Sequence, residues 1–352
     1  MTGTTEDAPG GTTSFAIDAG RLERYLRAAM PGFEGPVAIE KFAGGQSNPT
    51  YRIDTPGRRY VLRRKPPGQL LASAHAVDRE FRVQQALGRV AGFPVAPVHV
   101  YCEDPDIIGT PFYVMDLVEG RVFWDATLPE VPREQRRRYY ESMVDAIAAL
   151  HSLDHVALGL GDFGRPGDYF SRQISRWSRQ YLEDAHAGRV EAMDRLLDWL
   201  PRHIPAAQDA SVVHGDYRCD NIIFHPVEPR VVAILDWELS TIGHPLADFG
   251  YHLLAWRMPP LGVTGMLGQE LEALGIPGEQ EYVAMYCERT GRTDIPDLDF
   301  YAAFNMFRLA AIFHGIRGRM LRGNAVSARA REYAAAVERV AELGWAQTAN
   351  MR

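Results

Sequence analysis

A dense group of polar residues interrupts two apolar runs in the segment 212–238, VVHGDYRCDNIIFHPVEPRVVAILDWE. Its polar members are His214, Asp216, Asp220, Asn221, Asp236 and Glu238. The apolar runs resemble strands, so the polar residues fall at strand ends and in loops, where catalytic residues tend to be held. Phosphoryl transfer to a hydroxyl needs a carboxylate at the attacking group, oxygen ligands for Mg²⁺ and a cation for the phosphates. Carboxylates and an amide at these positions suit that chemistry.

The spacing within this segment indicates how the polar residues come together. His214-Gly-Asp216 is followed by four residues and then Asn221, and the run IIFHPVEPRVVAIL that comes next is long enough for a two-stranded hairpin. The hairpin ends at Asp236, so it can bring Asn221 and Asp236 to one metal ion. Mg²⁺ typically takes one or two carboxylates, with waters and phosphates as its other ligands. The pattern H-x-D-x-x-x-x-N, hairpin, Asp is the arrangement of kinase-type sites.

The triplet Asp-Phe-Gly, which carries the metal-binding aspartate in protein kinases, occurs twice. Asp162 precedes the segment 212–238, and Asp248 lies beyond the hairpin and beyond the turn STIGHP. Neither position is where the metal ligand has to be. The spacing therefore assigns that role to Asp236, in LDWE.

The elements that must position these residues fall into two regions. Strand-like runs at 37–42, 50–54 and 59–65 precede a helical stretch at 73–90, and two more strands follow at 98–104 and 111–120. This order predicts an antiparallel sheet with one helix packed on it. A short helix that Asp18 caps and Pro31-Gly32 ends should come before the sheet.

After Gly120 the pattern becomes helical. The stretches 132–153, 168–186 and 190–204 predict helices, and the first two carry clear apolar stripes. Apart from the short strands at 221–225 and 230–237, the remainder is helical in pattern. We therefore predict an α+β fold with a flexible tail at 1–14, an N-terminal lobe at 15–118 and a larger, mainly helical lobe at 119–352.

Composition argues against several classes of function. The 352 residues carry 38 Lys and Arg against 45 Asp and Glu, a formal net charge of −7, whereas binders of nucleic acid or anionic membranes are usually basic. The three cysteines are far apart, which argues against a zinc ribbon or a disulfide framework. No apolar run is long enough to span a membrane, and the first residues do not resemble a signal peptide. We expect a cytoplasmic protein.

The segment HGDYRCDNIIF…VVAILDWELSTIGHPLADFGYHL resembles the aminoglycoside phosphotransferase (APH)-like family of small-molecule kinases, from about residue 38 onward. The stretches FAGGQSNPTYRI, YVLRRKPPG and SAHAVDREFRV are most similar to the branch related to the kinase-like domain of some acyl-CoA dehydrogenases. The resemblance implies a protein-kinase-like two-lobed fold, ATP and Mg²⁺ as cofactors, and Asp216 as the catalytic residue. It also implies Asn221 and Asp236 as metal ligands, a structural His214, and an Asp248 that caps the catalytic-loop backbone.

The resemblance places the nucleotide site in the N-terminal lobe. FAGGQSNPTY lies between two strands, as a phosphate-covering loop should, although it is not a Walker A motif. Gly44 and Gly45 permit close backbone approach, while Ser47 and Asn48 can donate hydrogen bonds to phosphate. The segment YVMDLVEG should contact the adenine, through Met115, Asp116, Leu117 and Val118.

A cation on the strand YVLRRK should pair with the phosphates. In register with the family, Arg63 takes the place of the usual lysine, and Lys65 on the same face of the strand is the alternative. Glu80, in the helix that follows, is the expected partner of this cation.

We expect the acceptor to be a small molecule with a hydroxyl group. Its contacts should come from the helical stretches YHLLAW (251–256) and FNMFRLAAIFHGIRGR (304–319), where Arg308 and Arg319 are candidate anchors for an anionic group. The branch suggests a hydroxyacyl-CoA or hydroxy acid, and the family name suggests an aminoglycoside or another small alcohol. A nucleotide-binding pseudokinase is a further alternative. A protein kinase is disfavoured because no activation segment ending in Ala-Pro-Glu follows Asp236.

Overall fold

The computed structural model describes residues 17–42, 48–67, 76–165, 167–207, 209–260, 265–323 and 328–351. The chain forms two compact units. The first, here called the sheet unit, extends to Gln85 and includes Ala96–Leu117. The second, the helical unit, contains Ala86–Val95 and everything from Val118 onward.

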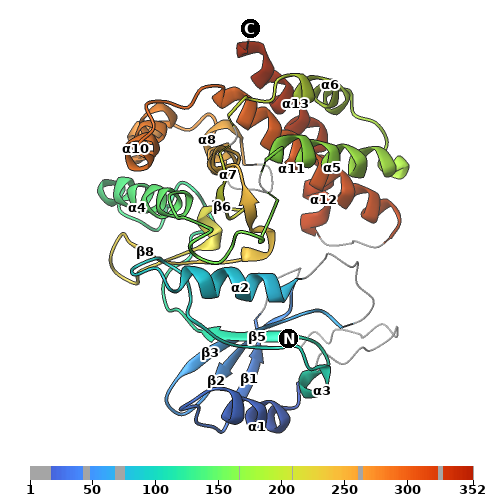
Figure 1. Ribbon diagram of the computed structural model, residues 1–352. Helices are drawn as coiled ribbons and strands as arrows, with labels where there is room; N and C mark the ends of the chain where they lie inside the picture. The colour runs from blue at the N-terminus through green and yellow to red at the C-terminus, as the bar shows by residue number, and fades with distance from the viewer. Residues whose placement is uncertain are drawn as a thin grey trace, which may run out of the picture. The chain divides into compact units, whose positions relative to one another are not determined.

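The sheet unit is built on one antiparallel sheet in the order β1-β2-β3-β5-β4 (Figure 1). The strands are β1 (Ala38–Lys41), β2 (Thr50–Asp54), β3 (Arg59–Arg64), β4 (Val98–Cys102) and β5 (Phe112–Asp116). The helices are α1 (Ala19–Ala29), α2 (Val77–Leu87) and α3 (Pro105–Ile108). The strand order along the chain agrees with the predicted α+β layout, and Asp18 caps α1 through Arg21 N at 2.9 Å as expected. The short helix α3 was not predicted.

The two faces of this sheet have different neighbours. Leu22 and Leu26 of α1 pack with Ile53 and Leu62 in one apolar cluster. Side chains alternate along a strand, so Arg63, the neighbour of Leu62, points to the opposite face. There it meets Glu80 of α2. The face that α2 covers therefore carries the Arg63–Glu80 pair.

The helical unit contains most of the helices and two small sheets (Figure 1). Its helices are α4 (Arg133–His151), α5 (Tyr169–Glu183), α6 (Glu191–Trp199), α7 (Pro245–His252), α8 (Leu254–Arg257), α9 (Leu271–Leu274), α10 (Glu279–Thr290), α11 (Leu298–Leu321), α12 (Ala328–Ala335) and α13 (Val337–Gln347). Its strands form two antiparallel pairs, β6 (Ser211–Val213) with β9 (Thr241–Gly243) and β7 (Ile222–Phe224) with β8 (Val231–Ile234).

The core of the helical unit is organised around α11. This helix is buried on nearly all sides along its first four turns, which marks a central helix rather than a surface one. It packs against α5, α7, α12 and α13. The predicted stripe of α5 is confirmed, with Phe170, Ile174, Trp177 and Tyr181 buried, and Phe170 meets the ring of Phe304 edge to face.

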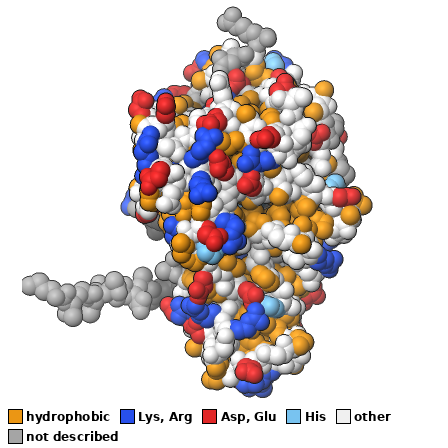
Figure 2. Space-filling model, turned by 90° about the vertical axis from the view of Figure 1, so that its left-hand side faces the viewer, with side chains coloured by type: hydrophobic (Ala, Val, Ile, Leu, Met, Phe, Trp, Pro, Cys, Tyr) orange, Lys and Arg blue, Asp and Glu red, His pale blue; other side chains and the backbone are white. Residues whose placement is uncertain are grey.

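The face that carries α4 and α10 shows interleaved acidic and basic side chains (Figure 2). Arg137 of α4 pairs with Glu141 one turn along and with Glu281 of α10, and Arg289 of α10 pairs with Asp145 of α4. These ion pairs join two helices that are distant in sequence. In the described part of the chain, no helix has the length and apolar character needed to cross a bilayer.

Candidate active site

The carboxylate of Asp216 lies at the centre of a hydrogen-bonded loop between β6 and the 3₁₀ turn η3 (Cys219–Asn221). Asn221 Nδ2 donates to Asp216 Oδ2 at 2.9 Å and also to the Asp216 carbonyl at 2.9 Å. The Tyr251 hydroxyl donates to Oδ1 at 2.7 Å, and Arg218 Nε lies 3.3 Å from the same oxygen. The side chain of Asp216 is 23% exposed, so the carboxylate is held in place yet open to a reactant.

The loop between β6 and η3, residues 214–218, is here called the catalytic loop after the role predicted for Asp216. His214 joins this loop to the segment that follows β8. Its ring is fully buried, and Nε2 lies 2.8 Å from the Leu235 carbonyl while Nδ1 accepts from Asp216 N at 3.2 Å. His214 thus has the structural position that was predicted for it. It lies two residues before Asp216 in the chain, and its ring contacts Leu235, the residue before Asp236.

Asp248 caps the backbone of the catalytic loop, as predicted. Its Oδ2 accepts from His214 N at 2.6 Å and its Oδ1 accepts from Gly215 N at 2.8 Å, while His151 Nε2 lies 3.2 Å from Oδ2. Burial opposes the charged form, but these donors, with His151 first among them, hold the pKa of Asp248 below its usual value. Gly215 has φ +85°, and a Cβ there would lie 2.8 Å from the Leu239 carbonyl oxygen, so the loop needs glycine.

The β7–β8 hairpin brings the two predicted metal ligands to the same end of a sheet. Ile222 pairs with Ile234, and Leu235 N donates to the Asn221 carbonyl at 2.8 Å. Leu235 therefore lies opposite Asn221, and Asp236 follows it directly. Asp236 has φ 63° and ψ 64°, a left-handed conformation that is uncommon without glycine and that Leu128, Asp168 and Asp297 also adopt.

The donor set fits Mg²⁺. With Nδ2 of Asn221 directed at Asp216, the amide oxygen faces away from that carboxylate and is suited to a cation. The described residues contain no group of three or more His, Cys, Asp or Glu side chains that could hold a metal by themselves. One carboxylate and one amide agree with an ion that takes its other ligands from water and phosphate.

The sheet unit holds the predicted cation–carboxylate pair. Arg63 Nε lies 2.8 Å from Glu80 Oε2, and the two side chains are 13% and 1% exposed. Asn48 Nδ2 donates to Glu80 Oε1 at 2.6 Å and the Tyr113 hydroxyl donates to Oε2 at 3.0 Å. Burial raises the pKa of Tyr113 well above its usual value, so the phenol remains a donor. Arg63, rather than Lys65, is therefore the cation that this carboxylate fixes.

The structure describes only some of the other residues that were predicted for the nucleotide site. Gly44, Gly45 and Ser47 lie outside the described residues. Asn48 is described, and its amide is used on Glu80. Lys65 follows the last residue of β3 and is half-buried.

The segment after β5 was predicted to contact adenine. Asp116 N donates to the Pro97 carbonyl at 2.9 Å and Leu117 N donates to the Arg59 carbonyl at 3.2 Å. Met115 lies opposite Val61 in the sheet and is buried. These two backbone donors are thus used within the sheet unit rather than being open to a base.

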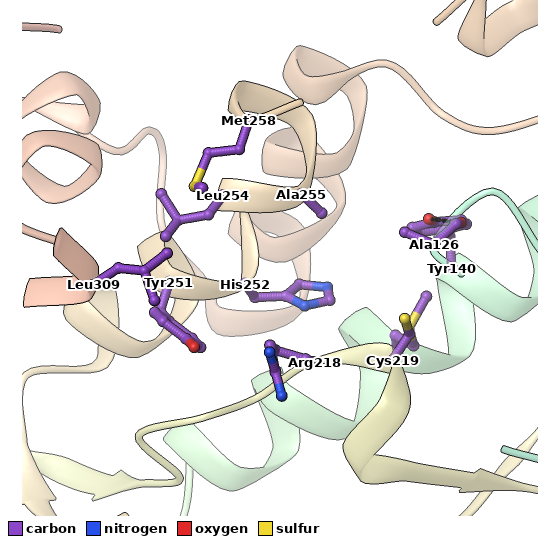
Figure 3. A pocket seen from close by; sticks show the side chains of 11 residues that line it. Ala126, Tyr140, Arg218, Cys219, Tyr251, His252, Leu254, Ala255, Met258 and Leu309 are labelled. Carbon is purple, nitrogen blue, oxygen red and sulfur yellow. Dashed lines mark hydrogen bonds between the residues drawn. The ribbon is translucent and has the colours of Figure 1, made fainter. Parts of the chain in front are cut away.

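An apolar pocket of the helical unit begins beside the catalytic loop (Figure 3). The space between its walls, with the solvent at its open side included, is about 470 Å³, and the room that its walls leave for water-sized molecules is about 30 Å³. Its lining residues are Ala126, Tyr140, Met143, Arg218, Cys219, Tyr251, His252, Leu254, Ala255, Met258 and Leu309. None of these described lining residues is acidic. Two of them, Arg218 and Tyr251, also contact Asp216, so the pocket lies beside the carboxylate that was predicted to be catalytic.

Three residues of this site were not found by sequence reasoning. Tyr251 was included only as the first residue of a stretch expected to contact the acceptor, without a role toward Asp216, and Arg218 was not singled out. Arg308 was considered as a surface anchor for an anionic group, but it is buried and donates to the Gly215 carbonyl at 2.6 Å. One signal was available for Arg308, because it lies in an otherwise apolar helical run, where a buried arginine must have a polar partner.

Comparison with known proteins shows which family the chain is similar to. The model of the Phosphotransferase enzyme family (APH) matches residues 38–302. Acyl-CoA dehydrogenase family member 10 of Mus musculus is 44% identical over 94% of this chain, and family member 11 of Gallus gallus is 45% identical over 93%. The chain spans less than half the length of these relatives, 31% and 43% respectively.

Solved structures share the fold. A crystal structure of a candidate aminoglycoside phosphotransferase from Ralstonia eutropha is 46% identical, with a TM-score of 0.88 over 95% of this chain and 99% of that one. The aminoglycoside phosphotransferase APH(4)-Ia, in ternary complex with ADP and hygromycin B, is 16% identical with a TM-score of 0.60 over 93% and 98% of the two chains, a likeness of fold alone. By its family match, its relatives and its kinase-like architecture, the chain belongs to the APH phosphotransferase family.

Proposed function

We propose that this chain is an ATP-dependent, Mg²⁺-assisted kinase that transfers the γ-phosphate to a hydroxyl of a small molecule. The observation that carries the proposal is the hydrogen-bonded group of Asp216 and Asn221 at the hairpin end where Asp236 follows. A carboxylate for the hydroxyl and two oxygen ligands for a metal are the parts that this reaction requires.

Each of these groups has a definite task. Asp216 orients the acceptor hydroxyl and takes its proton as the phosphoryl group is transferred. Asn221 Oδ1 and the Asp236 carboxylate would hold Mg²⁺, which supplies positive charge to the phosphate oxygens. Arg63, held by Glu80, pairs with the phosphates. Catalysis then consists mainly of positioning and charge stabilisation.

The pocket beside Asp216 supports an acceptor that carries an aliphatic chain. A polycationic aminoglycoside calls for acidic side chains, whereas the described lining is apolar and its charged member is Arg218. The names of the relatives, acyl-CoA dehydrogenase family members, point to acyl chemistry as well. We therefore favour a hydroxyacyl-CoA or hydroxy acid as the acceptor.

A mass-spectrometric screen tests the acceptor class. Hydroxylated acyl-CoAs, free hydroxy acids, sugars, choline-like alcohols and aminoglycosides are incubated with the protein and Mg-ATP, and the gain of one phosphate is recorded. We expect the gain on hydroxylated acyl compounds. Phosphate transfer to aminoglycosides, with none to the acyl compounds, would reverse this choice.

The Asp216→Ala variant tests the reaction itself. We expect transfer to fall by at least about a hundredfold, since a general base contributes roughly 10²–10⁴-fold, while the melting temperature stays near that of the wild type. A variant that transfers phosphate at the wild-type rate would show that Asp216 is not the base. A nucleotide-binding pseudokinase, the alternative, would instead show a thermal shift with Mg-ATP and no phosphate transfer to any compound of the screen.

A further inference from the structure

The helix α7 contacts the catalytic loop residue by residue. Asp248 binds the backbone of the first two loop residues, as described above. Three residues later, the Tyr251 hydroxyl donates to the carboxylate of Asp216. The adjacent His252 has Nδ1 at 3.2 Å from the Tyr217 carbonyl. Among these contacts, the one from Tyr251 reaches the reacting group itself.

Tyr251 is held in place by more than its hydroxyl. Its side chain is buried, and the guanidinium of Arg308 lies 5.0 Å from the centre of its ring. Arg308 also donates to the Gly215 carbonyl, so one arginine fixes both the tyrosine ring and the loop that carries Asp216. Burial, together with the neighbouring Asp216, raises the pKa of Tyr251 above its usual value, so the phenol keeps its proton and remains a donor.

The position of Tyr251 relates the carboxylate to the pocket. Its side chain lines the pocket together with Arg218, which approaches the same oxygen of Asp216 (Figure 3). A carboxylate oxygen accepts more than one hydrogen bond, so Oδ1 can keep the Tyr251 bond while it accepts from an acceptor hydroxyl. A donor on Oδ1 and Asn221 on Oδ2 together remove the rotational freedom of the carboxylate.

We propose that Tyr251 is a positioning residue of the phosphotransfer reaction, which orients Asp216 Oδ1 toward the acceptor hydroxyl at the entrance of the apolar pocket. The inference rests on the proposed function, because it takes Asp216 as the base. It adds a residue to the reaction and makes α7 the element that orients the base. Tyr251 acts through Asp216 and takes no proton itself.

The test compares two phenol-to-carboxylate hydrogen bonds of equal length. Tyr251→Phe keeps the ring and its contact with Arg308 but removes the bond to Asp216. Tyr181→Phe is the control, because the Tyr181 hydroxyl donates to Asp194 Oδ1 at 2.7 Å from α5, in a part of the unit that the reaction does not use. For both variants kcat, the KM values for Mg-ATP and for the acceptor identified in the screen, and the melting temperature are measured.

We expect Tyr251→Phe to lower kcat by about ten- to a hundredfold, the range that follows from one hydrogen bond to a charged group, with both KM values near those of the wild type. Tyr181→Phe should leave kcat unchanged. An unchanged kcat in Tyr251→Phe, or a loss confined to the KM for the acceptor, would overturn the positioning role. A collapse of the melting temperature in Tyr251→Phe alone would make Tyr251 a structural residue and overturn it as well.

These outcomes remain separate from a failure of the proposed function. If Asp216→Ala kept wild-type activity, Asp216 would not be the base, and there would be no reason for a residue that positions it. An inactive Asp216→Ala together with a fully active Tyr251→Phe would leave the kinase reaction in place and reject the role of Tyr251 alone.

Discussion

At the scale of single residues, the cation of the sheet unit is an arginine where kinases usually have a lysine. Arg63 pairs with Glu80, and Glu80 is itself held by Asn48 and Tyr113. A planar guanidinium can bind a carboxylate and still present other N–H groups to phosphate oxygens. The pair is therefore compatible with nucleotide binding, even though the residue type departs from the common pattern.

We predict that Arg63→Met loses about half or more of the thermal stabilisation by Mg-ATP. Nucleotide at about 100 times its Kd stabilises a protein by about 2.7 kcal/mol, and loss of a charge-assisted contact should weaken binding by about ten- to a hundredfold. The melting temperature with and without Mg-ATP measures the effect.

Lys65→Met is the matched control, since it removes a cation near the same end of β3 without removing a member of the Glu80 group. Its Mg-ATP shift should equal that of the wild type. The reverse result, with the shift lost in Lys65→Met and kept in Arg63→Met, would assign the phosphates to Lys65.

At the scale of elements, α7 and the β7–β8 hairpin hold the catalytic loop from two directions. Asp248 of α7 binds the loop backbone, and the pairing of β7 with β8 places the Asp236 segment opposite Asn221. Because α7 packs along α11, the loop is connected to the core of the helical unit.

We predict that Asp248→Asn lowers the free energy of unfolding by about 2–4 kcal/mol near neutral pH, because an amide can accept from only one of the two loop N–H groups. The pKa of Asp248 is held below its usual value. The stability that its carboxylate contributes is therefore fully present above the usual pKa of an aspartate, and it is lost as the pH falls through the lower pKa of the folded state. The difference between wild type and variant should therefore stay constant from about pH 5 to 7 and narrow below about pH 4. Urea unfolding across this range measures it.

Asp145→Asn provides the comparison. Asp145 is an exposed aspartate of α4 that pairs with Arg289, and such surface pairs contribute about 0–1 kcal/mol. A cost for Asp248→Asn as small as that of Asp145→Asn would contradict the capping role.

The spacing of Asp216, Asn221 and Asp236 around one hairpin is a short-range rule that a single sequence expresses. The Arg63–Glu80 pair was expected from the resemblance to the APH-like family, and the alternation of side chains along the strand gave only the face on which Arg63 lies.

The parts that were missed depend on contacts between distant segments. Strands β6 and β9 are three residues long, too short for a period to be visible, and they pair across about thirty residues. Tyr251 contacts a residue 35 positions earlier, and Arg308 contacts one 93 positions earlier. No local pattern marks such partners, because they are set by the packing of α7 and α11.

At the scale of the whole molecule, the helical unit is held together by side chains that join helices from distant parts of the sequence. Arg257, at the end of α8, pairs with Glu279 of α10 and Asp299 of α11. Its Nη1 also donates to Gln347 Oε1 of α13 at 2.8 Å. The side chain is 14% exposed, so solvent screens these interactions only in part.

We predict that Arg257→Met lowers the free energy of unfolding of the helical unit by about 1–3 kcal/mol, because two partly buried carboxylates lose their shared cation, a smaller cost than for a fully buried pair. Urea unfolding followed by circular dichroism measures this change. The Mg-ATP thermal shift should stay at its wild-type size, since Arg257 contacts none of the catalytic-loop residues described above.

Arg195→Met, which removes an exposed i,i+4 pair with Glu191 on α6, should cost less than about 0.5 kcal/mol. Equal costs for the two arginines would show that the helices around α11 are held by apolar packing alone.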